Sequence, residues 1–308
     1  MRILVTGAAG YLGSVLTPML LQAGHEVEAY DNLMYGQASL LDSIGHKNLT
    51  FHRADVRDEK NLDAAISRND IVVWLAAIVG APACAVDPQL AYEVNYYGMI
   101  LDSKTLKSKI VIYPNTNSGY GIGGERACVE TDTLNPLSDY GKSKCFAEEQ
   151  VRESWPNHVV FRFATLFGAS PRMRRDLIVN DFVFRAMDEN NIVIYEPYFR
   201  RNFLHVRDAA NAILWATSGR VSAGVYNCGD DRANMTKLEL CEKIKAHIPS
   251  LDIIIGTNKS DPDKRDYLVS NEKLMTTGWR PQFSLDDGIR ELMTAWQILH
   301  KRREYSNV

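Results

Sequence analysis

The stretch ILVTGAAGYLG, residues 3–13, decides the fold because it joins an apolar strand pattern to three regularly spaced glycines. Ile3–Val5 predicts a buried strand, and the glycines lead from it into a helix. Glycine permits a tight turn with close approach of the backbone to a phosphate, and a helix N-terminus attracts negative charge. Glycine-rich turns also occur without a ligand, so the interpretation as a dinucleotide site depends on the rest of the chain. The residues expected at the cofactor here are Gly7, Gly10, Tyr11, Leu12 and Gly13.

The first half of the chain alternates strand and helix patterns. The expected strands are residues 3–5, 27–30, 49–52, 71–75, 109–113 and 159–163. The expected helices between them lie near residues 12–23, 59–68, 89–106 and 141–153. This alternation predicts an α/β fold with a doubly wound parallel sheet of the Rossmann type, in which ligands bind at the carboxyl ends of the strands.

The pattern changes after about residue 164, where short strands and helices mix with prolines. Helices are expected near residues 178–190, 207–218, 235–247 and 285–300. We expect residues 1–164 to form a dinucleotide-binding domain and residues 165–308 to form mainly a smaller C-terminal substrate-binding lobe. The segment 200–218 is expected to return to the first domain.

The bulk composition predicts a sizeable core and no general affinity for polyanions. The 308 residues are 45% apolar with a net charge of −3, and the pI near 6.2 argues against a nucleic-acid surface. The apolar stretches are far shorter than the roughly 18 residues that span a bilayer, and the N-terminus lacks a secretory-signal layout. We therefore expect no membrane partner and a cytoplasmic location.

The five cysteines contain no Cys-x-x-Cys pair and are expected to be reduced thiols. No metal-ligand pattern is found among the histidines.

The second strand places an acid where a dinucleotide fold uses one. It ends in EAYDNL, residues 28–33, so Asp31 lies about where a carboxylate binds the adenosine ribose hydroxyls. A carboxylate there repels a 2′-phosphate, and no arginine comes immediately after it, so the sequence favours NAD over NADP. Residues after the third and fourth strands are expected to line the adenine and to pass beneath the cofactor: Asp55 and Val56, then Leu75, Ala76 and Ala77.

DYGKSK, residues 139–144, supplies a tyrosine and a lysine one helical turn apart. A free tyrosine has a pKa of about 10, and a nearby lysine cation together with the nicotinamide charge favours the phenolate of Tyr140. The phenolate can then take a proton from a sugar hydroxyl, and Lys144 can orient the nicotinamide ribose. The preceding strand ends in NTNSGYG, residues 115–121, where Thr116 can hydrogen-bond the reacting oxygen.

These motifs together resemble the extended short-chain dehydrogenase/reductases of the nucleotide-sugar epimerase/dehydratase group. The resemblance covers nearly the whole chain and rests on TGAAGYLG, DN at 31–32, DV at 55–56, LAA at 75–77, TNSGYG, YGKSK, RRNFLHVRD at 200–208 and GWRP at 278–281. It implies that Thr116, Tyr140 and Lys144 form the catalytic set and that Asn32 contacts NAD. It further implies initial oxidation of a nucleotide-diphosphate sugar at C4, and a homodimer formed through the helices near 89–106 and 141–153.

The two residues after Thr116 bear on the fate of the oxidised sugar. Dehydratases of this group carry Asp-Glu there, whereas this chain has Asn117 and Ser118, which titrate too far from neutral pH to act as acid and base. Dehydration is therefore disfavoured, and a 4-dehydrogenase and a 4-epimerase stay open. A non-catalytic NAD(H) sensor is disfavoured because the chain keeps Tyr140 and Lys144.

Four segments narrow the resemblance: VGAPAC at 79–84, NTNSGYGIG at 115–123, GASPRMRRDLIVNDF at 168–182 and DPDKRDYLVSN at 261–271. They resemble enzymes that oxidise C4 of GDP-D-glycero-D-manno-heptose for bacterial capsular polysaccharide. This similarity favours the dehydrogenase, with the 4-epimerase as the alternative.

Arginines and polar residues of the second half are expected to bind the substrate. Arg201 matches the family's diphosphate-binding arginine, and Arg265 is a second candidate because a guanidinium group suits phosphate oxygens. The full set of expected substrate-binding residues is Thr116, Asn117, Ser118, Arg174, Asn180, Arg201 and Arg265.

Five other polar residues are expected to have structural roles. Arg172 and Arg175 are expected at the solvated surface, and His205 is expected to be packed and hydrogen-bonded. Asp208 is expected to cap a helix over 209–218, and Asn95 is expected to bind the sheet from a long helix.

Overall fold

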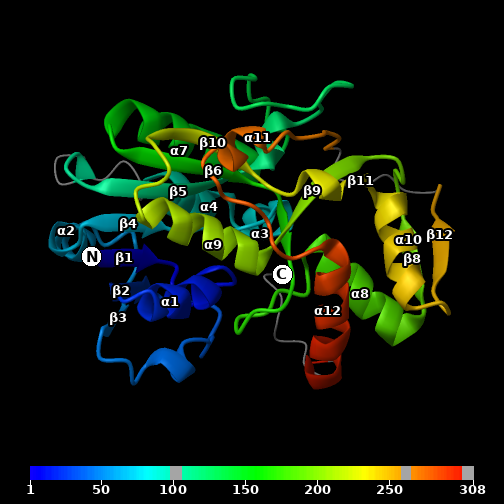
Figure 1. Cartoon of the computed structure of the whole chain (residues 1–308), viewed down its shortest axis with the longest axis horizontal. Coiled ribbons are helices and arrows are strands. Elements are labelled where there is room, and N and C mark those ends of the chain that lie inside the picture. Colours follow the sequence, from blue (N-terminus) through cyan, green and yellow to red (C-terminus); the bar gives the residue numbers. More distant parts are fainter. Residues whose placement is uncertain (98–105, 258–264, 300–308) are drawn as a thin grey trace.

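The computed structural model describes residues 1–97, 106–257 and 265–299. A seven-stranded sheet lies at its centre, with every neighbouring pair parallel, in the order β10-β6-β5-β4-β1-β2-β3 (Figure 1). Its strands are β1 (Arg2–Thr6), β2 (Glu26–Asp31), β3 (Leu49–Arg53), β4 (Ile71–Trp74), β5 (Ile110–Thr116), β6 (His158–Phe163) and β10 (Gly224–Cys228). The chain moves outward from β1 in both directions, so the predicted doubly wound Rossmann-type sheet is confirmed.

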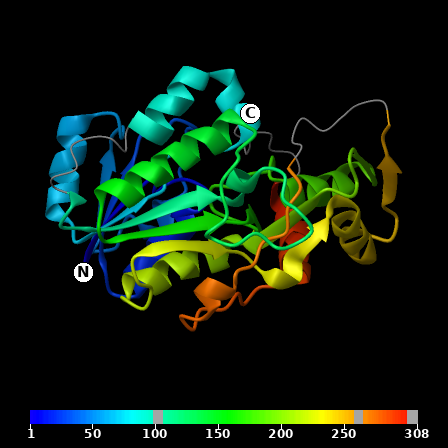
Figure 2. The same ribbon diagram turned by 90° about the horizontal axis from the view of Figure 1, so that it is seen from above.

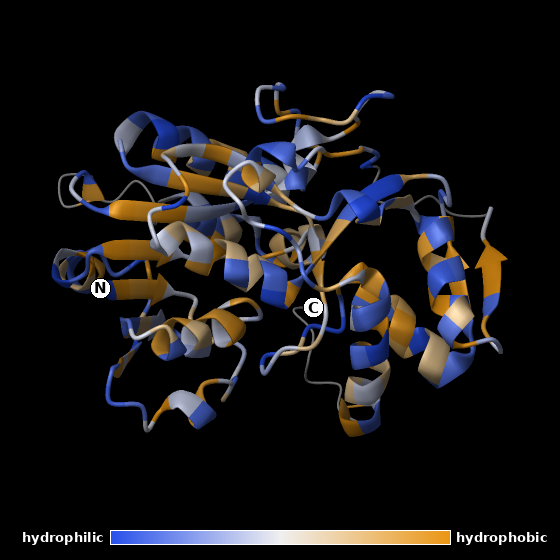
Figure 3. Cartoon of the chain, viewed as in Figure 1, coloured by the Kyte–Doolittle hydropathy of each residue, from blue (hydrophilic) through white to orange (hydrophobic). Residues whose placement is uncertain are grey.

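Helices cover both faces of this sheet, as Figure 2 shows from above. Alternate residues of β1 enter two different cores because successive side chains of a strand point to opposite faces. Ile3 and Val5 join the core that includes α1 (Gly13–Gln22) and α9 (Val206–Thr217). Leu4 joins the core that includes α2 (Glu59–Arg68) and α7 (Asp139–Ser154). This double burial explains the almost continuous apolar colour of the central strands in Figure 3.

Apart from β10, the strands after β6 form two further small sheets beside the central one (Figure 1). One contains β7 (Thr165–Phe167), β9 (Arg200–His205) and β11 (Asn234–Thr236); the other contains β8 (Asn191–Ile194) and β12 (Asp252–Ile255). The helices here are α8 (Ile178–Glu189), α10 (Lys237–His247), α11 (Glu272–Met275) and α12 (Leu285–Leu299). A capping box between Thr236 and Glu239 starts α10. The division at residue 164 stays a prediction, but β10 joins the central sheet and α9 packs against α1.

Two elements around β5 differ from the expectation. β5 continues past Tyr113 to Thr116, because it pairs with β6 as far as Thr116 and Phe163. Pro114 is tolerated because the pairing of β5 with β4 ends at Ile112, which leaves one side of the strand free of ladder bonds. The expected long helix over 89–106 is interrupted in its described part. It consists of α4 (Pro88–Tyr92) and a π-helical turn, η2 (Glu93–Tyr97), and residues 98–105 lie outside the described chain.

The remaining elements are short. They are α3 (Ala81–Val86) and the 3₁₀ turns η1 (Leu41–Ser43), η3 (Asn117–Tyr120) and η4 (Asp231–Ala233). Within residues 1–97, 106–257 and 265–299, no helix combines the length and apolar character needed to cross a membrane. All five cysteines are free.

Candidate active site

A cavity of about 450 Å³ lies at the carboxyl ends of the central strands. Its wall includes the glycine turn after β1 and the ends of β2, β3, β4 and β5, as expected for a parallel sheet of this topology. The predicted cofactor residues on this wall are Gly7, Gly10, Tyr11, Leu12, Gly13, Asp31, Asn32, Asp55, Val56, Leu75, Ala76 and Ala77.

Close packing of the backbone requires glycine at positions 7 and 13 of the turn. Gly7 has a φ of 68°, and a Cβ there would lie 2.7 Å from the backbone nitrogen of Ala76. A Cβ on Gly13 would lie 2.3 Å from the carbonyl oxygen of Gly7. No side chain caps the N-terminus of α1. The turn therefore brings the start of α1 close to the sheet and directs the helix terminus at the cavity.

Asp31 is held by backbone amides at the end of β2. Its carboxylate accepts hydrogen bonds from the amides of Ala9 (3.0 Å) and Leu33 (2.8 Å), and from the Gln37 side chain (3.2 Å). Burial raises the pKa of Asp31, while these amides and the charge of Arg172 oppose the rise. The carboxylate is thus fixed in position beside the glycine turn, where a ribose can reach it.

Asp55 forms the next acidic group along the wall. Asn32 donates a hydrogen bond to it (3.0 Å), and Arg57 binds it with its guanidinium (3.0 and 3.1 Å). The hydrogen bonds from Arg57 are the main reason that the pKa of Asp55 falls to about 2. Asp55 is therefore ionised at neutral pH and orients Asn32.

Thr116, Tyr140 and Lys144 lie on the same cavity wall as the glycine turn. Thr116 is the last residue of β5, and the side-chain carbonyl of Asn115 accepts a hydrogen bond from its amide (2.8 Å). The hydroxyl oxygens of Thr116 and Ser118 are 2.8 Å apart. Tyr140 and Lys144 come from the first turns of α7, which Ser138 caps. The predicted catalytic residues are thus brought together from two elements.

Burial dominates the electrostatics of this group. Burial raises the pKa of Tyr140 to about 12, although the charges of Arg174 and Arg265 lower it in part. Burial also lowers the pKa of Lys144 to about 7, and its amine lies 4.0 Å from the centre of the Tyr113 ring. Among the protein groups, burial therefore dominates the pKa of Tyr140, and the expectation that Lys144 together with the nicotinamide charge favours the phenolate stays a prediction.

The segment 168–176 brings two arginines to the cavity. Arg174 reaches the wall and pairs with Asp176. Arg172 is only 3% exposed and lines the cavity, so the expectation that it is a solvated surface residue is wrong. Its guanidinium lies 4.9 Å from the centre of the Tyr35 ring. Arg175 is away from this wall, paired with Asp188 at 3.0 Å.

The other predicted substrate residues divide into two groups. Arg265 and Ser118 line the cavity and are hydrogen-bonded to each other. Asn117 is 1% exposed, and Asn180 and Arg201 are also buried, but none of the three lies on the cavity wall. Asn180 accepts a hydrogen bond from the amide of Gly168 (3.0 Å) and donates to the carbonyl of Arg174 (2.7 Å). Arg201 donates to the carbonyl of Arg200 (2.9 Å). Direct substrate contact by these three stays a prediction that their placement does not support.

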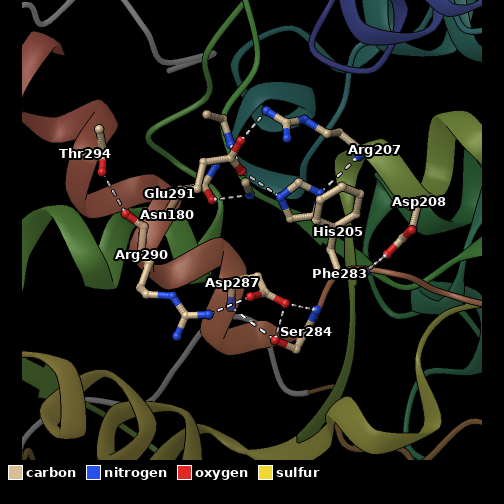
Figure 4. Close-up of polar contacts among 12 residues, drawn as sticks. Asn180, His205, Arg207, Asp208, Phe283, Ser284, Asp287, Arg290, Glu291 and Thr294 are labelled. Atoms are coloured by element: carbon tan, nitrogen blue, oxygen red, sulfur yellow. Dashed lines mark hydrogen bonds and ion pairs between the residues drawn. The ribbon is translucent and has the colours of Figure 1, made fainter.

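His205 and Asp208 have structural roles, one of them unexpected. Figure 4 shows the His205 imidazole directed at Glu291 of α12. The His205 Nε2 atom lies 2.7 Å from a Glu291 carboxylate oxygen, and the Phe283 ring stacks on the imidazole with 4.7 Å between the ring centres. His205, not Asp208, is the N-cap of α9. Asp208 instead accepts hydrogen bonds from the amides of Gln282 (2.9 Å) and Phe283 (3.0 Å). The expected capping role of Asp208 is wrong because α9 begins at Val206 and Asp208 lies inside its first turn.

Asn95 fixes the segment after β4. Its side chain accepts a hydrogen bond from the Ile78 amide (2.7 Å) and donates to the Ile78 carbonyl (3.0 Å) and to Ser143 (3.2 Å). It therefore ties the cavity wall to α7 rather than binding a strand.

Cys84 and Cys145 are not activated nucleophiles, since burial raises their thiol pKa values to about 11 and about 12.

Sequence reasoning missed several wall residues: Tyr35, Gln37, Val79, Gly80, Ser138 and Arg172. Ser138 had a local signal, because it precedes the helix that begins DYGKSK at a good N-cap position. Tyr35 and Arg172 had none, because their meeting depends on the packing of two segments more than 130 residues apart.

The comparisons with known proteins agree with this geometry. The model of a family described as "NAD dependent epimerase/dehydratase family" matches residues 3–229. A UDP-glucose 4-epimerase of Halalkalibacterium halodurans is 27% identical over 97% of this chain and 96% of the relative. A dTDP-glucose 4,6-dehydratase of Actinoplanes sp. is 28% identical over 96% of this chain and 97% of the relative.

A solved structure of a related protein superposes on nearly the whole chain. The crystal structure of a UDP-glucose 4-epimerase from Thermus thermophilus in complex with NAD superposes with a TM-score of 0.82 at 25% identity. The match covers 96% of this chain and 99% of that chain. The relatives thus include proteins named for two different reactions.

Proposed function

Because the chain belongs to the NAD-dependent epimerase/dehydratase family and NAD is its cofactor, we propose that it oxidises C4 of a nucleotide-diphosphate sugar. One observation carries this proposal: Thr116, Tyr140 and Lys144 share a single cavity wall with the glycine turn and Asp31. The donor set fits NAD, since the uncapped α1 terminus suits a pyrophosphate and the Asp31 carboxylate suits ribose hydroxyls.

In the proposed reaction Tyr140 takes the proton of the C4 hydroxyl and Thr116 holds the C4 oxygen. NAD, when bound, accepts the hydride from the same carbon. Lys144 lies on the next helical turn after Tyr140 and binds the nicotinamide ribose. With the hydride removed, loss of the hydroxyl proton to Tyr140 would complete the conversion of the C4 alcohol to a ketone. Positioning of C4 between Tyr140 and the cofactor supplies much of the rate.

The cavity chemistry disfavours dehydration. Elimination of water needs an acid and a base beside the sugar. Among the described residues, Asp31 and Asp55 are the only acids on the cavity wall, and both lie at the ends of β2 and β3, on the side of the expected adenosine. Ser118 is engaged with Thr116 and Arg265. We therefore do not assign the 4,6-dehydratase reaction to this chain.

Two fates of the hydride stay open within the proposal. The sequence similarity to enzymes that oxidise GDP-D-glycero-D-manno-heptose supports a 4-dehydrogenase, which releases the 4-keto sugar. The 27% identity to a protein named UDP-glucose 4-epimerase supports an epimerase, which returns the hydride to the other face of C4. The proposed heptose substrate, capsular polysaccharide pathway, cytoplasmic location and homodimer stay predictions.

The proposal is tested with a panel of GDP-, UDP- and dTDP-sugars, including the heptose, while the absorbance of reduced nicotinamide and the sugar products are monitored. Net NADH with a 4-keto product identifies a dehydrogenase, and a C4 epimer without net NADH identifies an epimerase. If every sugar leaves both the cofactor and the sugar unchanged, the C4 proposal is wrong and a non-catalytic NAD(H) sensor gains support.

A further inference from the structure

Ser118 is hydrogen-bonded twice to the hydroxyl group of Thr116. Its backbone amide donates to the Thr116 hydroxyl oxygen (3.1 Å), because Thr116 caps the 3₁₀ turn η3, and the two hydroxyl oxygens are 2.8 Å apart. Both residues line the cavity, and Ser118 is only 2% exposed. The position of the Thr116 hydroxyl is therefore set by the residue two places further along the chain.

The partners of the Ser118 hydroxyl decide which of the two hydroxyls donates. Among the described residues, these partners are the Thr116 hydroxyl and the guanidinium of Arg265. A guanidinium has no acceptor atom, so Arg265 donates to the Ser118 oxygen and the Thr116 oxygen is left to accept the Ser118 proton. The cation also polarises the Ser118 hydroxyl, which strengthens the bond that it donates. The Thr116 oxygen thus accepts two hydrogen bonds, one from the amide and one from the hydroxyl of Ser118.

This arrangement matters for the proton of a sugar hydroxyl. The C4 hydroxyl has one proton, and in the proposed reaction Tyr140 takes it. A Thr116 oxygen with a vacant acceptor site would compete with Tyr140 for that proton. Because a hydroxyl oxygen has two acceptor sites and Ser118 fills both, Thr116 can only donate to the C4 oxygen. As a donor it also stabilises the negative charge that develops on this oxygen when the proton leaves.

We propose that Ser118 is a positioning residue for the oxidation at C4: it fills the acceptor sites of the Thr116 hydroxyl and thereby makes Thr116 a hydrogen-bond donor to the C4 oxygen. The inference rests on the proposed function, since it needs the C4 oxygen to lie between Thr116 and Tyr140. Ser118 acts through Thr116 and not by contact with the sugar. Its effect on the rate should therefore vanish when Thr116 has no hydroxyl to orient.

The test is a double-mutant cycle of Ser118→Ala and Thr116→Val, measured as the rate at which bound NAD is reduced in a single turnover on a sugar that the wild type accepts. Ser118→Ala alone should slow this reduction by roughly 3–10-fold, the range for loss of one neutral hydrogen bond. Added to Thr116→Val, the same substitution should change the rate by less than about two-fold. Thr217→Val is the matched control and should react like the wild type, because it removes a buried hydroxyl of α9 that donates to the Leu214 carbonyl (2.7 Å).

Ser118→Cys guards against a folding defect in Ser118→Ala. A thiol is a weak donor, so we expect a smaller loss of rate than with alanine, and every variant should keep the wild-type affinity for NAD measured without sugar. The inference is overturned if the Ser118 variants react at the wild-type rate. It is also overturned if Ser118→Ala slows Thr116→Val by the same factor as it slows the wild type, since Ser118 then acts independently of Thr116. A wild type that oxidises no sugar at C4 refutes the proposed function and this inference together, whereas an additive cycle on an accepted sugar refutes this inference alone.

Discussion

Tyr140 lies in an environment that disfavours its charged form. Burial is the main cause of its raised pKa, and the two guanidinium groups of Arg174 and Arg265 are the described cations that oppose burial. Lys144, the expected source of positive charge, has a pKa lowered by burial to about 7. The two arginines therefore assist the base as well as facing the substrate.

We expect Arg174→Gln to shift the ascending limb of the pH profile of kcat upward by roughly one pH unit, because loss of a nearby cation raises the pKa of Tyr140. The phenolate is the active form, so at pH 7 the variant has less of it and turns over up to about ten-fold more slowly. The measurement is kcat against pH at saturating sugar. Arg175→Gln is the control, and overlapping profiles for Arg174→Gln and the wild type would refute the electrostatic role.

At the scale of elements, sequence reasoning worked where one element contains its own signal. The glycine turn, Asp31 and the Tyr140–Lys144 pair each lie within a few consecutive residues, and the structure puts all of them on one wall. It failed where the length or the sheet position of a strand depends on pairing with a distant element. β5 reaches Thr116 because β6 lies beside it. Val225 and Tyr226 favour a strand at Gly224–Cys228, but these five residues do not specify that β10 pairs with β6 at the edge of the central sheet.

A buried ion pair holds the elements behind the catalytic wall. Arg162 of β6 binds Glu148 of α7 with two hydrogen bonds (2.6 and 3.1 Å), and both side chains are 2% exposed. Glu148 also accepts a hydrogen bond from Asn115, whose carbonyl holds the amide of Thr116. Arg162 further donates to the Tyr120 hydroxyl (3.0 Å). The network therefore fixes the end of β5 against α7.

We expect Arg162→Met to lower the free energy of unfolding by about 3–5 kcal/mol, because it leaves the carboxylate of Glu148 buried without its main cation. The double variant Glu148→Met/Arg162→Met should lose clearly less, since no uncompensated charge stays buried. Urea unfolding of the single and double variants measures both values. Arg126→Met, which breaks a pair whose arginine side chain is 70% exposed, should lower the free energy of unfolding far less than Arg162→Met. Equal losses for Arg162→Met and Arg126→Met would contradict this account.

At the scale of the whole molecule, the catalytic cavity is assembled from distant parts of the chain. The central sheet supplies the glycine turn, Asp31 and Thr116, while the segment 168–176 and Arg265 complete the wall. The family match over residues 3–229 covers most of this assembly. The sequence could not show that Arg172 meets Tyr35, because only the folded chain brings their two segments together.

The whole-molecule account has a direct test in Tyr140→Phe, which removes only the hydroxyl. The central claim is that this hydroxyl takes the proton when C4 of a nucleotide sugar is oxidised. The substitution should therefore slow the reaction without changing the affinity for NAD. On a sugar that the wild type accepts, we predict that reduction of bound NAD in a single turnover slows by about 10²–10⁴-fold, while the dissociation constant for NAD stays within two-fold of the wild type. A single-turnover rate for Tyr140→Phe equal to that of the wild type would contradict the claim.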